Sequence, residues 1–287
     1  MRAGRKIGDV IRALALLAAV MPAAASPATR GDAPPRTRPE IRSEAYYVLD
    51  ESRSSVLAAR REHVAAPIAS ITKLMTALVV LEARQPMEQM LSITAGDVTG
   101  TAGSGSRLAQ GMRLSRGELL HLALMSSENR AAHALCRNYP DGLQACVRAM
   151  NEKAAALGMT TARFVDPTGL SSGNVASPED LAKLVIAAAG HATIREYSTD
   201  AEQTIAASRR QLAFRNTNPL VRNPAWQVNV QKTGYIAEAG RCLVMQTVID
   251  GRQVVIVLLN SWGRLTRIAD AKRIRTWMEA GHRLAAT

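Results

Sequence analysis

A serine and a lysine three residues apart are the first residues of the chain whose types and spacing could do chemistry. Ser70 and Lys73 lie in residues 67–81, an apolar run that predicts a buried helix, with Pro67 in its first turn and both side chains on one stripe. Burial lowers the pKa of an amine, and a neutral amine one turn from a hydroxyl can take the hydroxyl proton. The helix N-terminus would favour the anion that forms on Ser70. The alternative is a helix-starting serine beside a surface lysine, because so short a pattern also occurs by chance.

Two further fragments change the interpretation of this pair. Ser127-Glu128-Asn129 stands at the break before a predicted helix, where a serine is an ordinary N-cap, and Lys232-Thr233-Gly234 ends an apolar strand. The fragments form an ordered set, S-x-x-K, S-x-N and K-T-G, whose first residues are 57 and then 105 positions apart. The set S-x-x-K, S-D-N and K-T-G marks penicillin-binding proteins and class A β-lactamases. The order and the context therefore favour a serine acyltransferase over three chance matches.

The beginning of the chain predicts export rather than a folded element. Basic residues among the first six positions precede an apolar run at residues 13–20, which is too short to span a bilayer, and Ala23-Ala24-Ala25 fits a cleavage site. We therefore expect a signal peptide over residues 1–25, cleaved after Ala25, and a flexible leader over residues 26–43. The alternative is an uncleaved amphipathic or anchoring segment. Residues 44–287 are then long enough for one large domain.

The net charge limits the partners of an exported protein. It is +12 for the whole chain and +9 once the expected signal peptide, with four basic residues and one acidic residue, is removed. Such a charge attracts anionic polymers or membrane surfaces, although a genomic bias towards Arg and Ala would produce it too. Nucleic acid is disfavoured, because the chain is exported and only 3% of its residues are aromatic.

The spacing of cysteines and histidines gives no sign of a metal site. The five histidines form no H-E-x-x-H or H-x-H pattern, so a metallopeptidase is disfavoured and no cofactor is expected. Cys136 and Cys146 flank a predicted turn between two helices, so they could form a disulfide in an oxidising compartment. The alternative is that these two residues and Cys242 are small buried hydrophobes.

The elements that must position the motif residues change along the chain from strands to helices and back. Strands are expected at residues 45–49, 55–60, 228–234, 241–249 and 253–259, with Asp250-Gly251 as a hairpin signal. Between them we expect a short strand at 90–93, a Gly- and Ser-rich loop at 100–111, and helices at 115–124, 128–136, 143–157, 178–189 and 193–198, with a last helix at 264–278. This order predicts an α+β fold, in which helices flank one antiparallel sheet and a mainly helical lobe is inserted at about residues 91–225. The Ser70 helix and the strand that ends at Lys232 should meet between the two parts, where clefts form.

Longer stretches around these motifs resemble the low-molecular-mass penicillin-binding proteins, and most closely their D-alanyl-D-alanine endopeptidase branch. The resemblance extends over about residues 42–280 and is carried by residues 67–77, 122–132, 157–160, 163–170, 214–218, 232–234 and 240–245. It implies the α+β fold of β-lactamases and DD-peptidases. It also implies a serine acyltransferase that cleaves D-alanyl bonds in peptidoglycan and is acylated covalently by β-lactams.

The resemblance implies a role in the reaction for each catalytic residue. Ser70 would attack the carbonyl of a D-Ala peptide bond and become an acyl ester. Lys73 would take the proton of the serine, and Ser127 would relay a proton to the leaving amine. The backbone N–H groups of Ser70 and Tyr235 would form the oxyanion hole.

The resemblance also implies which residues hold the substrate. Asn129 would hydrogen-bond the acyl donor, and Lys232 and Thr233 would hold the carboxylate next to the scissile bond. Gly234 would leave room for the substrate to lie along the strand edge like an added strand. A cationic Lys232 near Lys73 would lower the pKa of Lys73 further. A diaminopimelate cross-link and a terminal D-Ala both carry such a carboxylate, so one site could serve endopeptidase and carboxypeptidase reactions.

Three alternatives to an endopeptidase stay open. One is a D-Ala-D-Ala carboxypeptidase, and the second is a β-lactamase, which needs a deacylating carboxylate. Asp166 is the acidic candidate, but a turn carboxylate before proline is more often structural, so we expect slow deacylation. The third, a non-catalytic peptidoglycan-binding protein, is disfavoured by the three intact motifs. Because the sequence stops at Thr287, soon after the last predicted helix, we expect no further domain or membrane anchor, and a soluble periplasmic monomer.

Overall fold

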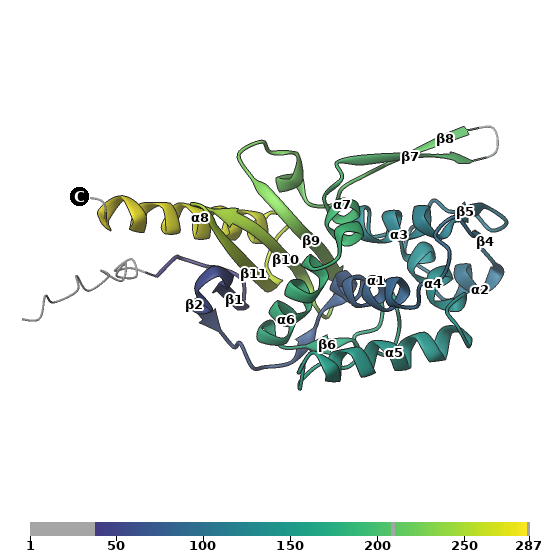
Figure 1. The fold of residues 1–287 in the computed structure, drawn as a ribbon, viewed down its shortest axis with the longest axis horizontal. Coiled ribbons are helices and arrows are strands. Elements are labelled where there is room, and N and C mark those ends of the chain that lie inside the picture. The colour runs from purple at the N-terminus through teal and green to yellow at the C-terminus, as the bar shows by residue number, and fades with distance from the viewer. Residues whose placement is uncertain (1–37, 208–209, 286–287) are drawn as a thin grey trace, which may run out of the picture. The chain divides into compact units, whose positions relative to one another are not determined.

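The computed structural model describes residues 38–207 and 210–285, which lie within one compact unit of the chain (Figure 1). The expected signal peptide and the expected leader up to residue 37 lie outside the described residues. The α-helices are α1 (Thr72–Glu82), α2 (Ala95–Thr99), α3 (Arg116–Met125), α4 (Asn129–Arg137), α5 (Gly142–Ala156), α6 (Pro178–Ala189), α7 (Ala192–Thr199) and α8 (Thr266–Ala285). Across the described part of the chain, no helix is both long enough and apolar enough to cross a bilayer.

The main sheet has five strands in the order β2-β1-β11-β10-β9, and all neighbouring strands are antiparallel, as the sequence predicts. Its strands are β1 (Ala45–Asp50), β2 (Ser55–Arg60), β9 (Gln227–Ile236), β10 (Gly240–Ile249) and β11 (Arg252–Ser261). The predicted hairpin between β10 and β11 is confirmed. Asp250 and Gly251 have positive φ angles of 55° and 73°, as the tight turns of β-hairpins require.

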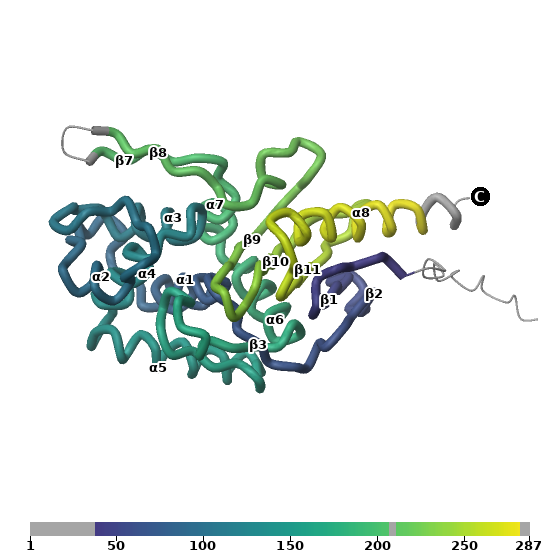
Figure 2. The backbone as a smooth tube through the Cα atoms, turned by 180° about the vertical axis from the view of Figure 1, so that it is seen from behind, coloured from purple at the N-terminus to yellow at the C-terminus, as the bar shows by residue number. Residues whose placement is uncertain are grey.

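Helices cover both faces of this sheet, which explains why its central strands are almost continuously apolar. Val255 and Val257 of β11 belong to the core that also contains α1 and α6, whereas Ile256 and Leu258 belong to the core under α8. Successive side chains of a strand point to opposite faces, so this alternation follows from the strand itself. Figures 1 and 2 show α8 on one side of the sheet and α6 on the other.

The helix α1 is the central element of the part that carries the first motif. Its residues from Thr72 to Val80 are all buried, as the all-round apolar run predicts. It packs against α3, α4, α5 and α6, while β9 passes η2 (Ala69–Ile71), the 3-10 turn in front of α1. The first motif and β9, the strand that follows the inserted lobe, therefore meet at one place.

Within the described residues, three short ladders lie outside the main sheet: β3 (Ala66–Pro67) with β6 (Val175–Ala176), β4 (Met90–Ser92) with β5 (Arg113–Ser115), and β7 (Glu202–Ala207) with β8 (Arg210–Arg215). The short strand expected at 90–93 is confirmed as β4, whereas the sequence analysis missed the other five strands. Two further 3-10 segments are η1 (Glu51–Arg53) and η3 (Pro219–Arg222). The β7–β8 hairpin escaped prediction because its sequence, rich in Ala and Gln, lacks both a glycine or asparagine turn and a clear period of two.

Candidate active site

Ser70 lies in η2, the single turn that leads directly into α1. The prediction that Pro67 opens this helix is wrong, because Pro67 belongs to β3 and pairs with Val175. A proline is accepted in so short a strand, where its missing N–H removes little ladder bonding. The α-helix begins at Thr72, so Ser70 stands just before the N-terminus of a buried helix, where a developing negative charge is favoured.

The backbone next to the serine is held in a strained conformation. Ala69 has a φ of 48°, in the left-handed region, which costs a residue with a side chain about 1–3 kcal/mol. Its carbonyl accepts a 2.8 Å hydrogen bond from Thr72 Oγ1, which in turn accepts one from Asn174 Nδ2. Gly169 packs against the same carbonyl so closely that a Cβ there would lie 1.9 Å from the Ala69 oxygen. The turn around Gly169 therefore fixes the turn that presents Ser70.

Lys73 is buried with three polar partners around its amine. Its Nζ lies 2.9 Å from Ser70 Oγ, 2.6 Å from Asn129 Oδ1 and 2.7 Å from the Thr168 carbonyl oxygen. Burial lowers the pKa of Lys73 to about 7, although the carboxylates of Asp166 and Glu128 act in the opposite direction. A neutral amine has two hydrogens and one lone pair. With the hydrogens on the amide and the carbonyl, the lone pair faces the serine hydroxyl, as a general base requires.

Ser127 does not take the capping role that is the ordinary function of a serine before a helix. Glu128 is the N-cap of α4, and its side chain accepts from the backbone N–H of Arg130. Ser127 has a φ of 62°, again in the left-handed region, and its Oγ accepts a 2.8 Å hydrogen bond from Lys232 Nζ. Since the serine oxygen is the acceptor, its own hydrogen stays available for another group in the site.

Lys232 reaches Ser127 from β9, across 105 residues of sequence. It is fully buried, and its Nζ also donates to the Thr233 carbonyl oxygen at 2.9 Å. Burial, and repulsion from the nearby charges of Lys73 and Arg267, lower the pKa of Lys232 well below its ordinary value. The expected closeness of the two lysines is confirmed, but the repulsion is felt by Lys232, whereas burial accounts for the pKa of Lys73.

The remaining predicted residues of β9 line the same junction. The Thr233 hydroxyl is hydrogen-bonded to the Thr217 hydroxyl at 2.6 Å. A Cβ on Gly234 would lie 3.0 Å from the Ile68 carbonyl oxygen and 3.1 Å from the Ser70 backbone nitrogen, so this strand passes the serine backbone in near contact. The adjacent residue Tyr235 is 57% exposed, and the Arg241 guanidinium lies over its ring, 4.5 Å from the ring centre. The structure therefore brings the three motifs to one site.

Three contributors to this site were not predicted from the sequence. The Thr168 carbonyl binds Lys73, and Thr217 binds Thr233, but neither a backbone carbonyl nor a lone threonine has a sequence signature. Arg267 of α8 is 8% exposed, and its Nε has no hydrogen-bond partner among the described residues. The sequence could have indicated Arg267 only as a basic residue beside Ile268, on the apolar side of a helix.

Asp166 acts on the site through the turn that it organises. Its carboxylate accepts from the backbone N–H groups of Thr168, Gly169 and Ser171 at 2.6, 2.8 and 3.0 Å, and from the Thr168 hydroxyl at 2.5 Å. These four bonds place the Thr168 carbonyl on Lys73 and Gly169 on the strained Ala69. A carboxylate so fully hydrogen-bonded within its own turn is poorly suited to activate water.

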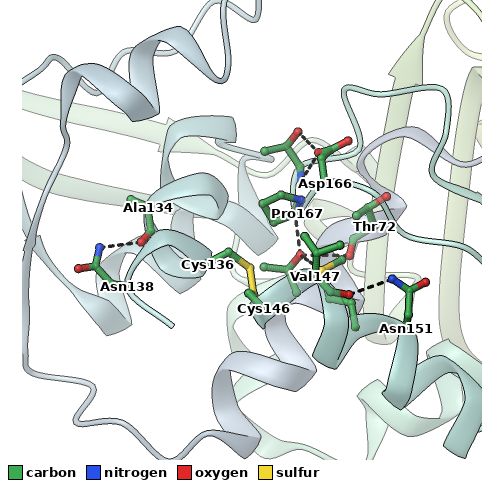
Figure 3. The surroundings of a disulfide bond; sticks show 12 residues. Thr72, Ala134, Cys136, Asn138, Cys146, Val147, Asn151, Asp166 and Pro167 are labelled. Carbon is green, nitrogen blue, oxygen red and sulfur yellow. Dashed lines mark hydrogen bonds between the residues drawn. A yellow bond between two sulfur atoms is a disulfide. The ribbon is translucent and has the colours of Figure 1, made fainter. Parts of the chain in front are cut away.

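A disulfide joins Cys136 of α4 to Cys146 of α5 (Figure 3). The two Cα atoms are 5.4 Å apart, within the ordinary range for such a bond. Of the two alternatives that the sequence left open, the disulfide is therefore the one observed. Cys242 is a free, buried thiol whose pKa is raised by burial to about 11. The disulfide ties α4, which carries Asn129 at its first position, to the helix that packs on α1.

A family model for D-alanyl-D-alanine carboxypeptidases matches residues 32–263. The chain belongs to the D-alanyl-D-alanine carboxypeptidase family, peptidase S11. A D-alanyl-D-alanine endopeptidase of Pseudomonas aeruginosa is 42% identical over 276 residues, which are 94% of this chain and 89% of that relative. A D-alanyl-D-alanine endopeptidase of Escherichia coli K12 is 43% identical over 270 residues, covering 93% of this chain and 87% of the relative.

A solved structure of a DD-transpeptidase shares the fold. The DD-transpeptidase of Streptomyces K15 superposes with a TM-score of 0.79 at 25% sequence identity, over 85% of this chain and 99% of that one. The predicted family and the predicted α+β fold class are thus confirmed. In this S11 family member, the serine, the two lysines and the second serine of the three motifs lie around one site at the junction of the sheet and α1.

Proposed function

We propose that the chain is a serine D-alanyl-D-alanine endopeptidase that cleaves the D-Ala–diaminopimelate cross-links of peptidoglycan through an acyl-enzyme on Ser70. The observation that carries the proposal is the 2.9 Å contact between Ser70 Oγ and the buried amine of Lys73, whose pKa is about 7. About half of such an amine is neutral at pH 7, which suits a general base. The 42–43% identical relatives that are D-alanyl-D-alanine endopeptidases support the choice of reaction.

Acylation uses first the Ser70–Lys73 pair and then the Ser127–Lys232 pair. Lys73 removes the Ser70 proton as the serine oxygen attacks the D-Ala carbonyl carbon. The negative charge that develops on the carbonyl oxygen is stabilised by the backbone N–H groups of Ser70 and Tyr235. Ser127, whose oxygen is held by Lys232, gives its hydrogen to the leaving amine and regains a proton from Lys73, which took it from Ser70, so both groups return to their starting state. Collapse of the tetrahedral intermediate breaks the C–N bond, and water later hydrolyses the Ser70 ester.

Substrate binding falls to the second lysine and its neighbours. Lys232 and Thr233 hold the carboxylate next to the scissile bond, which compensates the cost of burying the ammonium and raises the lowered pKa of Lys232. Gly234 lets the substrate backbone run beside β9, because any side chain there would meet the Ser70 turn. The Asn129 amide accepts from Lys73 with its oxygen and can donate from Nδ2 to the acyl donor.

A labelled penicillin separates this reaction from its nearest rivals. Stable labelling of Ser70 is expected, because the Asp166 carboxylate is engaged by four donors within its own turn. Rapid turnover of the label would instead indicate a β-lactamase, and an unlabelled protein would be a peptidoglycan-binding protein without catalysis. The Ser70→Ala variant is the control, since it removes the acylated oxygen and leaves the other motifs intact.

A chromatographic comparison of muropeptides tests the endopeptidase choice. Cleavage of the cross-linked dimer to monomers is expected. A second candidate function, the removal of a terminal D-Ala, is favoured by the same feature, because a terminal carboxylate fits the Lys232 and Thr233 site equally well. Activity on the uncross-linked pentapeptide alone would make the chain a carboxypeptidase and refute the proposal.

The proposed activity requires export to the periplasm, where peptidoglycan is found. We place the signal peptide at residues 1–25 with cleavage after Ala25, the leader at residues 26–43, and the peptidase domain at residues 44–287 with its helical insertion at about residues 91–225. The partners are peptidoglycan stem peptides and β-lactams, and the mature chain works as a monomer without a membrane anchor. Protein sequencing of the N-terminus from a periplasmic extract, with size-exclusion chromatography of the mature form, tests this assignment.

A further inference from the structure

A pocket of about 210 Å³ adjoins the proposed active site on the side of Ser127 and Asn129. Its other walls are the loop that contains Arg107 and the end of β8 at Phe214 and Arg215. The mechanism described above uses Ser127 and Asn129 but gives the arginine side of this pocket no role. The pocket lining combines two exposed arginines, Arg107 and Arg215, with two residues of the proposed active site.

The Arg107 guanidinium is held in position by its surroundings. It lies over the Phe214 ring at 3.9 Å from the ring centre, and its Nη2 donates to the Ala213 carbonyl oxygen at 2.7 Å. Stacking on one face leaves the edge of a planar guanidinium able to donate to a second acceptor. The loop that carries it is anchored as well, because the Arg107 backbone N–H donates to Glu128 at 3.2 Å.

The groups that face the pocket carry more positive than negative charge. Glu128 is an acidic residue of its lining, but its carboxylate already accepts from the Ser106 hydroxyl and from the backbone N–H groups of Arg107 and Arg130. Arg215 is only loosely paired, with its Nε 3.8 Å from a Glu202 carboxylate oxygen and its side chain 78% exposed. The two arginines, with the buried lysines behind them, therefore attract an anion to this wall.

We propose that Arg107 and Arg215 bind a second carboxylate of the peptidoglycan stem peptides, distinct from the one next to the scissile bond. The inference rests on the proposed function, because the substrate must reach both Ser70 and this pocket. Stem peptides carry free carboxylates in both cross-linked strands, and a guanidinium fork matches a carboxylate with two parallel hydrogen bonds. The pocket then favours stem peptides with a free carboxylate over amidated ones.

The test compares binding of carboxylate and carboxamide forms of one cross-linked muropeptide. Both are titrated by calorimetry into full-length Ser70→Ala protein, which cannot cleave them, with and without Arg215→Gln. Arg215→Gln is expected to weaken binding of the carboxylate form about five-fold, as a partly exposed charge pair allows, and to leave the carboxamide form unchanged. Arg215→Lys should retain part of the affinity, since it keeps the charge and loses the fork.

Controls separate this effect from general loss of charge and from the proposed reaction. Arg113→Gln removes an exposed arginine of β5 that does not line the pocket, and is expected to leave both affinities unchanged. Amidation of the acyl-donor strand and of the acceptor strand in separate titrations identifies the strand that supplies the carboxylate.

Two results would overturn the inference. These are equal weakening of both ligand forms by Arg215→Gln, and no weakening of either. Since the titration needs no cleavage, a protein that binds as expected but is never acylated by penicillin would refute the proposed function alone. Acylation at Ser70 without any carboxylate preference would refute the inference alone.

Discussion

The rate of Ser70 acylation should fall steeply with pH below 7, because only the neutral amine of Lys73 can accept the serine proton. With a pKa of about 7, about half of Lys73 is neutral at pH 7 and about one per cent at pH 5, so the second-order rate constant should drop about fifty-fold between them. A lysine at its ordinary value of 10.5 would be neutral in only about one molecule in three thousand at pH 7. Its acylation rate would then still be rising at pH 9.

Stopped-flow acylation by a fluorescent penicillin between pH 5 and pH 9 measures this profile. The expected curve rises about tenfold per unit well below pH 7 and levels off above pH 8. Lys73→Ala should retain the fold, as judged by circular dichroism, and lose at least about a hundred-fold in rate.

Acid unfolding does not account for such a profile. The pKa of Lys73 is lower in the folded than in the unfolded chain, so the unfolded chain binds more protons between about pH 7 and 10.5, and stability from this group rises with pH there. Between pH 7 and pH 5 the further loss of stability is only about 0.4 kcal/mol, because the folded state is then already half protonated. A rate independent of pH from 5 to 9 in a folded protein, or undiminished acylation of Lys73→Ala, would refute the assignment of Lys73 as the base.

Three further predictions concern the residues that hold the site in place. Gly169→Ala should lower the unfolding free energy by about 3 kcal/mol or more, because its Cβ would lie 1.9 Å from the Ala69 oxygen at a φ of 80°. Gly158→Ala is the matched control in thermal melts, with a φ of 67° and open space around it, and should cost about 1 kcal/mol. Reduction of the Cys136–Cys146 disulfide, or Cys136→Ser with Cys146→Ser, should cost about 3 kcal/mol in urea unfolding, as expected for a loop of 10 residues; an unchanged midpoint would contradict this. Asp166→Asn should lower the melting temperature and slow acylation, because it weakens the turn that holds Lys73. It should leave the lifetime of the penicilloyl-enzyme unchanged, and a lifetime extended more than about tenfold would reveal a deacylating role.

The sequence determined those features of the protein whose geometry is local. A spacing of three residues at the start of a helix brings two side chains to the same side of the chain, so Ser70 and Lys73 had to be neighbours once the apolar run became a buried helix. In the same way, Asp250-Gly251 determined a hairpin and its register, because few residues accept two successive positive φ angles. The apolar strands joined by tight turns at both ends of the chain, and the periodic helices between them, gave the α+β class for the same reason.

Only the tertiary structure decided which residues far apart in the sequence meet. Ser127 and Glu128 could both have capped α4, and contacts with Lys232 and with the loop of Ser106 and Arg107 decide that Glu128 does. The partners of Lys232 depend on how α1 and α4 pack beside β9, and that packing sums many weak apolar contacts with no local signature. The approach of Gly169 to Ala69 likewise depends on a turn that the Asp166 carboxylate orders, and this turn lies about a hundred residues after Ala69 in the chain. Dihedral preferences act within a few residues and can be read from the sequence, whereas the distance between two buried amines is set by the packing of every element between them.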